Sequence, residues 1–251
     1  MNWWNDLWLN EGFATWMGGK PIRAWKPDWA SVDVGGAMEI DSTKSPRPVR
    51  SSEGPPPTDI VYGKASNILR MMESYEGEDV FRAGINAYLK AHAFGSVTAE
   101  DFWNAQAKAS GKPIDRIMPT FVDQPGVPLI QIEAIREGSQ TFITLSQHRF
   151  FRDRGAFAQG SPELWQVPVC LRSAATVPSG GPAAQCVLLN ERTQTYKLRN
   201  LAPPVIANAA QKGYYRVMYA PDVLREFNRT AETKLTPAER VGLVVGAHSE
   251  T

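Results

Sequence analysis

The spacing of apolar residues predicts helices over the first half of the chain. From residue 1 to about 125, apolar side chains recur three and four positions apart, which is the period of a helix with one buried face. Gly18-Gly19 is expected to end the first helix, because glycine is common where helices stop. The segment 46–57 contains five prolines and is expected to form a surface loop. A second helix is expected over about 62–75.

Two further helices are expected before the pattern changes. Phe81, Ile85 and Leu89 lie four positions apart, which predicts a buried stripe on a third helix. Thr98 and Asp101 resemble a capping box, in which two side chains bind free backbone amides at a helix start. We expect a fourth helix there. Its apolar residues are Phe102, Trp103 and Ala107.

The period changes from helical to alternating after Pro125-Gly126. Short alternating runs separated by turn residues predict a small all-β module over about 127–219. The runs lie at 130–135, 142–145, 164–171, 185–189, 194–198 and 214–219. Helical spacing returns at 221–229 and 237–248, and the chain stops within that last pattern. At both ends, the sequence therefore looks as if it interrupts a longer helical pattern.

The first helix combines an apolar surface with one carboxylate. Four of the eight tryptophans fall in it, and its apolar residues surround it nearly completely, which is typical of a helix inside a larger core. Glu11 shares a face with Trp4, Leu7 and Ala14. A carboxylate buried on that face is costly unless it meets a cation, a metal or a proton. If the face instead reaches the surface, Glu11 is simply solvated.

Charge and hydropathy narrow the function classes. The 251 residues hold 27 basic and 26 acidic side chains, so no basic surplus is available to neutralise the phosphates of a nucleic acid. The chain has no apolar stretch of about 18 residues and no signal-peptide pattern, so we expect a soluble chain without a membrane segment. The compartment stays open between cytoplasm and periplasm or another extracytoplasmic space, because any signal would precede Met1.

Two cysteines are too few for a disulfide-rich scaffold or a cysteine-based zinc finger. Cys170 and Cys186 flank a Pro-Ser-Gly-Gly turn almost symmetrically, so they could face each other across neighbouring strands. We nevertheless expect free buried thiols, because the loop between them is long and the strand register is unknown. Pairing is the alternative.

The segment around Glu11 resembles the stretch that carries the third zinc ligand in the M1 family of zinc aminopeptidases. Residues 3–14 read WWNDLWLNEGFA. In that family, an HExxH motif is followed by the glutamate of an N-E-G-F-A segment. The resemblance implies that Glu11 is a zinc ligand.

Other segments resemble the same family, in the family's order. Residues 60–66 resemble the Y-x-K-[GA] segment, whose tyrosine hydroxyl stabilises the oxyanion of the tetrahedral intermediate, and Tyr62 matches that tyrosine. Seen alone, Tyr62 would be read as a core tyrosine at a helix start. The remaining matches lie at 125–130, 147–150, 213–219 and 235–240.

The resemblance implies a multidomain fold of α and β parts. Residues 1–125 would be the helical C-terminal half of a thermolysin-like catalytic domain, 126–219 an antiparallel β-sandwich, and 220–251 the beginning of a C-terminal α-helical domain. It also implies peptide substrates, from which the N-terminal residue is hydrolysed. The cofactor would be Zn²⁺, which polarises the scissile carbonyl and activates water.

The sequence departs from the family in its zinc site. HExxH is absent, and so is the GAMEN segment that binds the substrate's amino group. A catalytic zinc needs three protein ligands, and His92, His148 and His248 include no pair at i, i+4 spacing. We interpret the GAMEI string at 36–40 as a coincidence, because it follows Glu11 and lacks the final asparagine. We therefore expect the isolated chain to bind zinc weakly or not at all and to be inactive alone.

Two other functions remain open at this point. The chain could be a non-catalytic scaffold or peptide-binding relative, although the presence of both Glu11 and Tyr62 argues against it. It could also be a half-enzyme that is completed by a separate chain carrying the missing N-terminal portion. The apolar first helix is compatible with the half-enzyme, because such a helix needs a covering surface.

Overall fold

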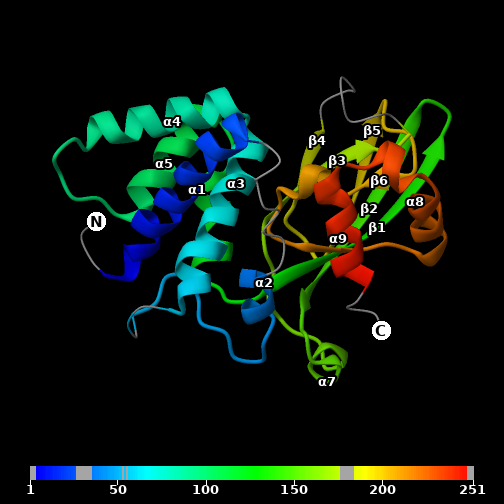
Figure 1. Cartoon of the computed structure of the whole chain (residues 1–251), viewed down its shortest axis with the longest axis horizontal. Helices are drawn as coiled ribbons and strands as arrows, with labels where there is room; N and C mark the ends of the chain where they lie inside the picture. The colour runs from blue at the N-terminus through cyan, green and yellow to red at the C-terminus, as the bar shows by residue number, and fades with distance from the viewer. Residues whose placement is uncertain (1–3, 27–35, 53, 55, 176–183, 248–251) are drawn as a thin grey trace. The chain divides into compact units, whose positions relative to one another are not determined.

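The protein has a mixed α/β fold in the computed structural model (Figure 1). The structure describes residues 4–26, 36–52, 54, 56–175 and 184–247. The chain divides into two compact units, Met1–Gly126 and Val127–Thr251. Within the described residues, the first unit is helical and both sheets belong to the second. No helix in these ranges has the length and apolar character needed to cross a bilayer.

Helices surround one apolar core in the first unit. Phe81 and Phe102 are buried there, and the ring of Phe81 lies edge-on to those of Trp16 and Phe102. Aromatic pairs in this arrangement add to the gain from burying their surface. The elements are η1 (Trp4–Asp6), α1 (Leu7–Trp25), α2 (Gly36–Asp41), η3 (Asp59–Lys64), α3 (Ala65–Glu76), α4 (Glu78–Ala91), α5 (Ala99–Ser110) and α6 (Ile114–Val122).

Most of the helical expectations for this unit are confirmed. The expected helices correspond to α1, α3, α4 and α5, and the described part of 46–57 contains no helix. The capping box is present: Thr98 accepts from the backbone of Asp101, and the Asp101 side chain accepts from the backbone of Thr98. The spacing of apolar residues did not predict α6.

Two details of the helical expectation are wrong. Gly18-Gly19 does not end α1, which continues through Pro21 to Trp25. A glycine ends a helix when it takes a positive φ, and neither glycine is among the residues with that conformation. Leu89 is 53% exposed, so it does not extend the buried stripe of Phe81 and Ile85.

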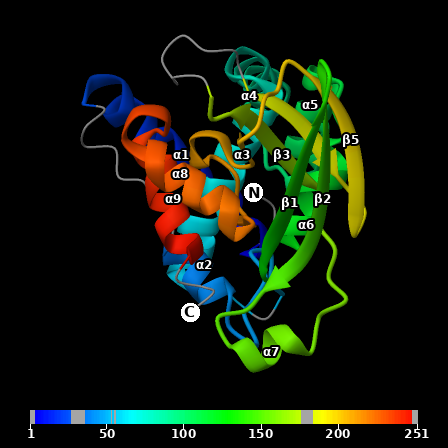
Figure 2. The same cartoon turned by 90° about the vertical axis from the view of Figure 1, so that its right-hand side faces the viewer.

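The second unit contains two sheets. The strands are β1 (Val127–Glu137), β2 (Gln140–Phe150), β3 (Val167–Ser173), β4 (Gln185–Leu189), β5 (Thr193–Arg199), β6 (Val205–Ile206) and β7 (Arg216–Met218). One sheet has the order β5-β2-β1-β7 and the other the order β4-β3-β6. Most pairs are antiparallel, but β1 and β7 run parallel, so the first sheet is mixed. The long β1–β2 hairpin is plain in Figure 2.

Strands form at or near each of the expected runs, but most of them begin or end at other residues than expected. The run 185–189 coincides with β4, whereas the run 214–219 shortens to β7. The two-residue β6 was not expected, because two residues are too few to show a period. Ile135 is 61% exposed, so the buried alternation of β1 ends before it.

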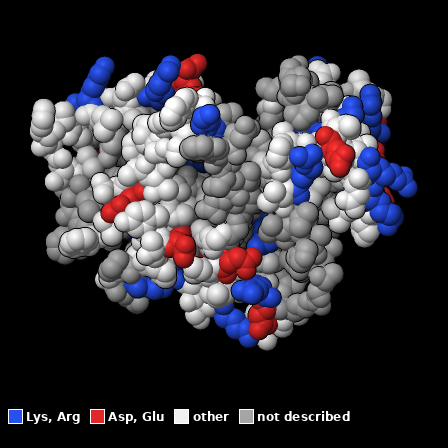
Figure 3. Space-filling view, viewed as in Figure 1, with Lys and Arg blue, Asp and Glu red and all other residues white. Residues whose placement is uncertain are grey.

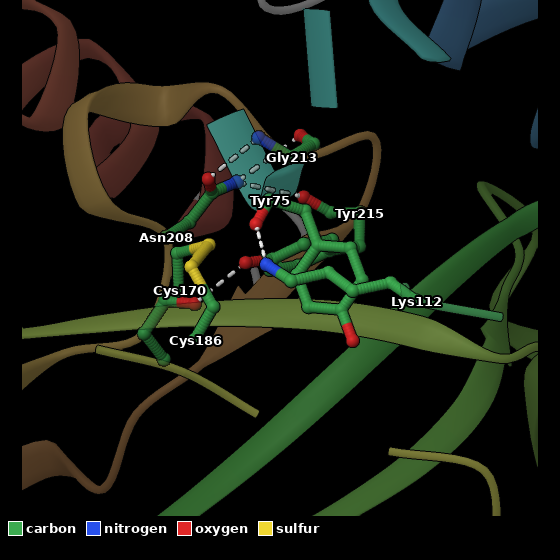
Figure 4. Close-up of a disulfide and its surroundings, with 8 residues drawn as sticks. Tyr75, Lys112, Cys170, Cys186, Asn208, Gly213 and Tyr215 are labelled. Atoms are coloured by element: carbon green, nitrogen blue, oxygen red, sulfur yellow. Dashed lines mark hydrogen bonds between the residues drawn. A yellow bond between two sulfur atoms is a disulfide. The ribbon is translucent and has the colours of Figure 1, made fainter. Parts of the chain in front are cut away.

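The expectation of free thiols is wrong. Cys170 and Cys186 lie directly opposite each other on antiparallel β3 and β4, with their Cα atoms 4.0 Å apart, and they form a disulfide (Figure 4). Beside it, Asn208 accepts a hydrogen bond from the Gly213 amide and donates to the Gly213 and Tyr215 carbonyls. The strand register makes the pairing possible.

The described part of the second unit also contains three α-helices. They are α7 (Arg154–Ala158), which lies between β2 and β3, and α8 (Pro221–Lys234) and α9 (Pro237–Ala247) near the C-terminus. Glu239, at the start of α9, is buried and binds the Arg172 guanidinium through both carboxylate oxygens. It also accepts from the amides of Ala210 and Thr236. This carboxylate therefore joins α9 to β3 and to η4 (Ala209–Gln211), which precedes β7.

Candidate active site

Glu11 and Tyr62 lie together in the first unit. Glu11 is half-buried on α1, and Tyr62 is 39% exposed on η3. Hydrogen bonding to the Glu11 carboxylate raises the pKa of the Tyr62 hydroxyl above its ordinary value, with smaller contributions from burial and from the carboxylate's charge. Two residues 51 positions apart in the sequence are thus brought into one polar cluster.

A close approach of two helical segments brings these two side chains together. α1 packs along η3 and α3. At the crossing, a Cβ atom placed on Gly12 would lie 2.4 Å from the Cβ of Ala65. Any side chain at position 12 would therefore push the helices apart. Since Gly12 follows Glu11 and Ala65 follows Tyr62 by three, the contact fixes the distance between the two polar groups.

Tyr62 sits on a π-helical segment. In η3 the backbone bonds run from residue i to i+5, an arrangement that is rare and frequent at functional sites. Ile60 and Val61 are buried on its inner side. Gly63 faces α2, where a Cβ would lie 3.1 Å from the Cβ of Ala37. The segment is therefore held tightly on the side away from Tyr62.

A buried ion pair anchors the same segment. The Lys64 Nζ lies 2.8 Å from Oδ2 of Asp41, and both side chains have 0% exposure. Nζ also donates to the carbonyls of Gln124 and Gly126, at 3.1 and 3.4 Å. The other oxygen of Asp41, Oδ1, accepts from the Gly126 amide at 2.8 Å. All three ammonium protons thus have an acceptor.

The sequence did not reveal this ion pair. Lys64 belongs to the Y-x-K-[GA] segment, and a lysine between apolar residues was the available signal. Asp41 lies 23 positions earlier, in a helix that carried no chemical expectation. The GAMEI string forms part of that helix, and its Ala37 contacts Gly63.

The face of α1 that carries Glu11 is partly exposed, which favours the solvated alternative over full burial. Trp4, on the same face, is 71% exposed, and Ala14 is also exposed. The buried face of α1 consists instead of Trp8, Leu9, Gly12 and Trp16. In the described part of the unit, α1 packs on one side, so an almost entirely apolar helix leaves several apolar residues exposed. Those are Trp4, Met17, Ile22 and Trp25.

The described residues do not form a zinc site by themselves. No group of three His, Cys, Asp or Glu side chains among them is placed to hold a metal ion. His92 follows α4, with its ring tilted against that of Tyr88, and His148 is exposed on β2. His248 lies outside the described residues. Glu11 is the one ligand that the resemblance assigns, whereas zinc needs three protein ligands.

The first unit has a surface pocket that includes Asn10, the residue before Glu11. It lies over α1 and α4, and neither Glu11 nor Tyr62 lines it. Its lining residues are Leu9, Asn10, Phe13, Tyr88, Leu89 and Val97. The face shown in Figure 3 carries both basic and acidic side chains among the residues that the structure describes.

Comparison with known proteins identifies close sequence relatives. Residues 1–121 match the Peptidase family M1 domain. The chain is 34% identical over 234 residues to the "Tricorn protease-interacting factor F2" of Thermoplasma volcanium, covering 88% of the chain and 27% of that protein. It is 31% identical over 262 residues to "Aminopeptidase 2" of Candida albicans, covering 99% of the chain and 27% of that protein.

A third relative, from an animal, is matched over a similar share of its length. The chain is 29% identical over 259 residues to the "Puromycin-sensitive aminopeptidase" of Caenorhabditis elegans, with 97% of the chain and 27% of that protein covered. The chain thus spans between a quarter and a third of the length of these relatives.

Proposed function

The chain belongs to peptidase family M1, and we propose that it is part of a zinc-dependent aminopeptidase that hydrolyses the N-terminal residue from peptides. Two of the relatives described above are named aminopeptidases. In this proposal, its 251 residues carry one zinc ligand and one oxyanion donor. Because they contain neither HExxH nor GAMEN, the chain is inactive alone.

Tyr62 is the proposed donor to the oxyanion. When a peptide carbonyl is attacked, negative charge develops on its oxygen, and a hydroxyl fixed nearby stabilises that charge by about 3–4 kcal/mol. The 39% exposure of Tyr62 leaves its side chain accessible to a substrate. A tyrosine hydroxyl is protonated at neutral pH even at its ordinary pKa of about 10, so it can act as a hydrogen-bond donor.

Glu11 is the proposed zinc ligand. It is half-buried and close to Tyr62, so a substrate carbonyl bound at a metal held by Glu11 would also lie near the tyrosine hydroxyl. The observation that carries the proposal is this proximity. Hydrogen bonding between Tyr62 and Glu11, two residues that the family resemblance assigned to one site, supports the proposal.

An assay of peptide hydrolysis tests the proposal. Release of a fluorescent group from aminoacyl-coumarin substrates is measured for the chain alone and after mixing with a second polypeptide that carries the HExxH and GAMEN segments of a relative. We expect no release by the chain alone and release after mixing. Tyr62→Phe should abolish that release, whereas the matched control Tyr75→Phe should preserve it. Hydrolysis that survives Tyr62→Phe, or a mixture without activity, contradicts the proposal.

A further inference from the structure

The position of the Tyr62 hydroxyl depends on a backbone segment that is held from its opposite side. Tyr62 and Lys64 are two positions apart on η3, and residues at that spacing do not share a face of a helical turn. Accordingly, Tyr62 is 39% exposed while the Lys64 side chain is fully buried. The packing around Tyr62 therefore leaves much of its side chain free, and its placement depends on the backbone.

The ion pair of Lys64 and Asp41 restrains that backbone from two directions. Lys64 binds Asp41 on α2 and the carbonyls of Gln124 and Gly126. Asp41 in turn accepts from the Gly126 amide. Gly126 adopts φ +103°, a conformation that side-chain-bearing residues rarely take. The end of η3 is thus tied both to α2 and to the segment after α6.

A π-helical segment needs such restraint. It is rare because its hydrogen-bond geometry is unfavourable compared with an α-helix, and it persists where the surroundings fix it. An apolar pair of similar volume could fill the same space, and replacing buried ion pairs in this way often leaves stability unchanged. Directional bonds between charged groups, by contrast, fix geometry as well as volume.

We infer that the buried ion pair of Lys64 and Asp41 is a positioning element that holds the Tyr62 hydroxyl against the Glu11 carboxylate by fixing the π-helical turn of η3. Both residues act through Tyr62 and neither touches the reacting atoms. The catalytic meaning of this inference rests on the proposed function. The geometric claim can be tested without catalysis.

The test is the ¹³C NMR signal of the Tyr62 Cζ atom, measured at one pH in the 251-residue chain with ¹³Cζ-labelled tyrosine. The chemical shift of this carbon changes with the hydrogen-bond partner of the hydroxyl. The chain has seven tyrosines, and the Tyr62 signal is the one that disappears in Tyr62→Phe. In the unmodified background, Glu11→Gln should move the Tyr62 signal. In the Asp41→Leu/Lys64→Met background, the same Glu11→Gln change should leave it unmoved. The other tyrosine signals show whether the chain is folded.

Two further variants keep the test decisive. Lys20→Met removes a different cation that links α1 to α3 through Glu73, and the effect of Glu11→Gln should persist in that background. If the double variant does not fold, Lys64→Arg, which keeps the charge with a larger head group, should reduce the effect. An undiminished effect of Glu11→Gln in the folded double variant, or in Lys64→Arg, overturns the inference.

The outcome is separable from that of the proposed function. The NMR measurement requires neither zinc nor substrate. An undiminished Glu11 effect removes the positioning role and leaves the peptidase proposal in place. Inactivity of the mixed polypeptides removes the peptidase proposal and leaves the positioning geometry in place.

Discussion

Gly12 on α1 contacts Ala65 on α3 so closely that a Cβ on Gly12 would lie 2.4 Å from the Cβ of Ala65. Real Cβ atoms do not approach each other to that distance, so the two segments would have to separate. The glycine after Glu11 therefore has a packing role that follows from geometry. It sets how near α1 comes to the segment that carries Tyr62.

Gly12→Ala should destabilise the first unit by about 1–3 kcal/mol, because it overpacks a contact that has no free space. Gly18→Ala is the matched control on the same helix, where nothing lies within 4 Å of the added Cβ. That change should stabilise the unit by about 0.5–1 kcal/mol, since alanine favours the helix. Urea unfolding followed by tryptophan fluorescence measures both, because seven of the eight tryptophans precede residue 127. Equal stability of the two variants would contradict the account.

Lys64→Met should cost about 3–5 kcal/mol of unfolding free energy, because it leaves the carboxylate of Asp41 buried without a partner. Adding Asp41→Leu should recover most of that loss, since two apolar side chains can fill the site of a buried ion pair. The same fluorescence-detected unfolding serves here. A single variant within about 1 kcal/mol of the unmodified chain would show that the pair is not buried as described.

Removing the disulfide by Cys170→Ala/Cys186→Ala should lower the stability of the second unit by about 3 kcal/mol, the usual contribution for a loop of this length, with the cysteines 16 positions apart. Differential scanning calorimetry measures the change. A thiol count in the unfolded, unreduced chain provides the check. Two reactive thiols there would mean that the cysteines are free after all.

The stability of the second unit should fall in acid through Glu239. Burial opposes ionisation of this carboxyl, but bonds from Arg172 and from the amides of Ala210 and Thr236 outweigh it and lower its pKa. A carboxyl whose folded pKa is lowered contributes stability above its unfolded pKa of about 4.3, and that stability is lost as the pH falls through the folded value.

Glu239→Gln should therefore cost about 2–4 kcal/mol at pH 7 and progressively less below about pH 4. The measurement is urea unfolding of both chains across that pH range. The exposed Asp222→Asn variant on α8 is the control and should have little effect at either end. A penalty for Glu239→Gln that stays constant with pH would contradict the lowered pKa.

The spacing of apolar residues predicted well which segments are helices and which are strands, because these elements pack one face on a core. It failed at Gly18-Gly19, since a glycine inside a helix costs only about 1 kcal/mol and packing of α1 on η3 and α3 offsets that amount. It also failed at Leu89, because a strict four-residue spacing drifts off the buried face of a 3.6-residue helix, and Tyr88 is buried there instead.

The candidate site was accessible from the sequence only in part. Glu11 and Tyr62 stand in recognisable segments, so a resemblance could identify them. Asp41 could not be found in this way, because its role comes from an ion pair with Lys64, which lies 23 positions later in the sequence. The disulfide of Cys170 and Cys186 likewise depends on strand register, which alternation alone does not determine.

Our central proposal is that these residues carry one zinc ligand, Glu11, of a peptidase site whose other ligands they do not supply. The most direct test is the zinc content of the purified chain, by elemental mass spectrometry after dialysis against trace zinc, for the unmodified chain and for Glu11→Ala. We predict well under one zinc per chain, unchanged by the substitution. One zinc per chain that is lost in Glu11→Ala would contradict the claim, because the remaining ligands would then lie within these 251 residues.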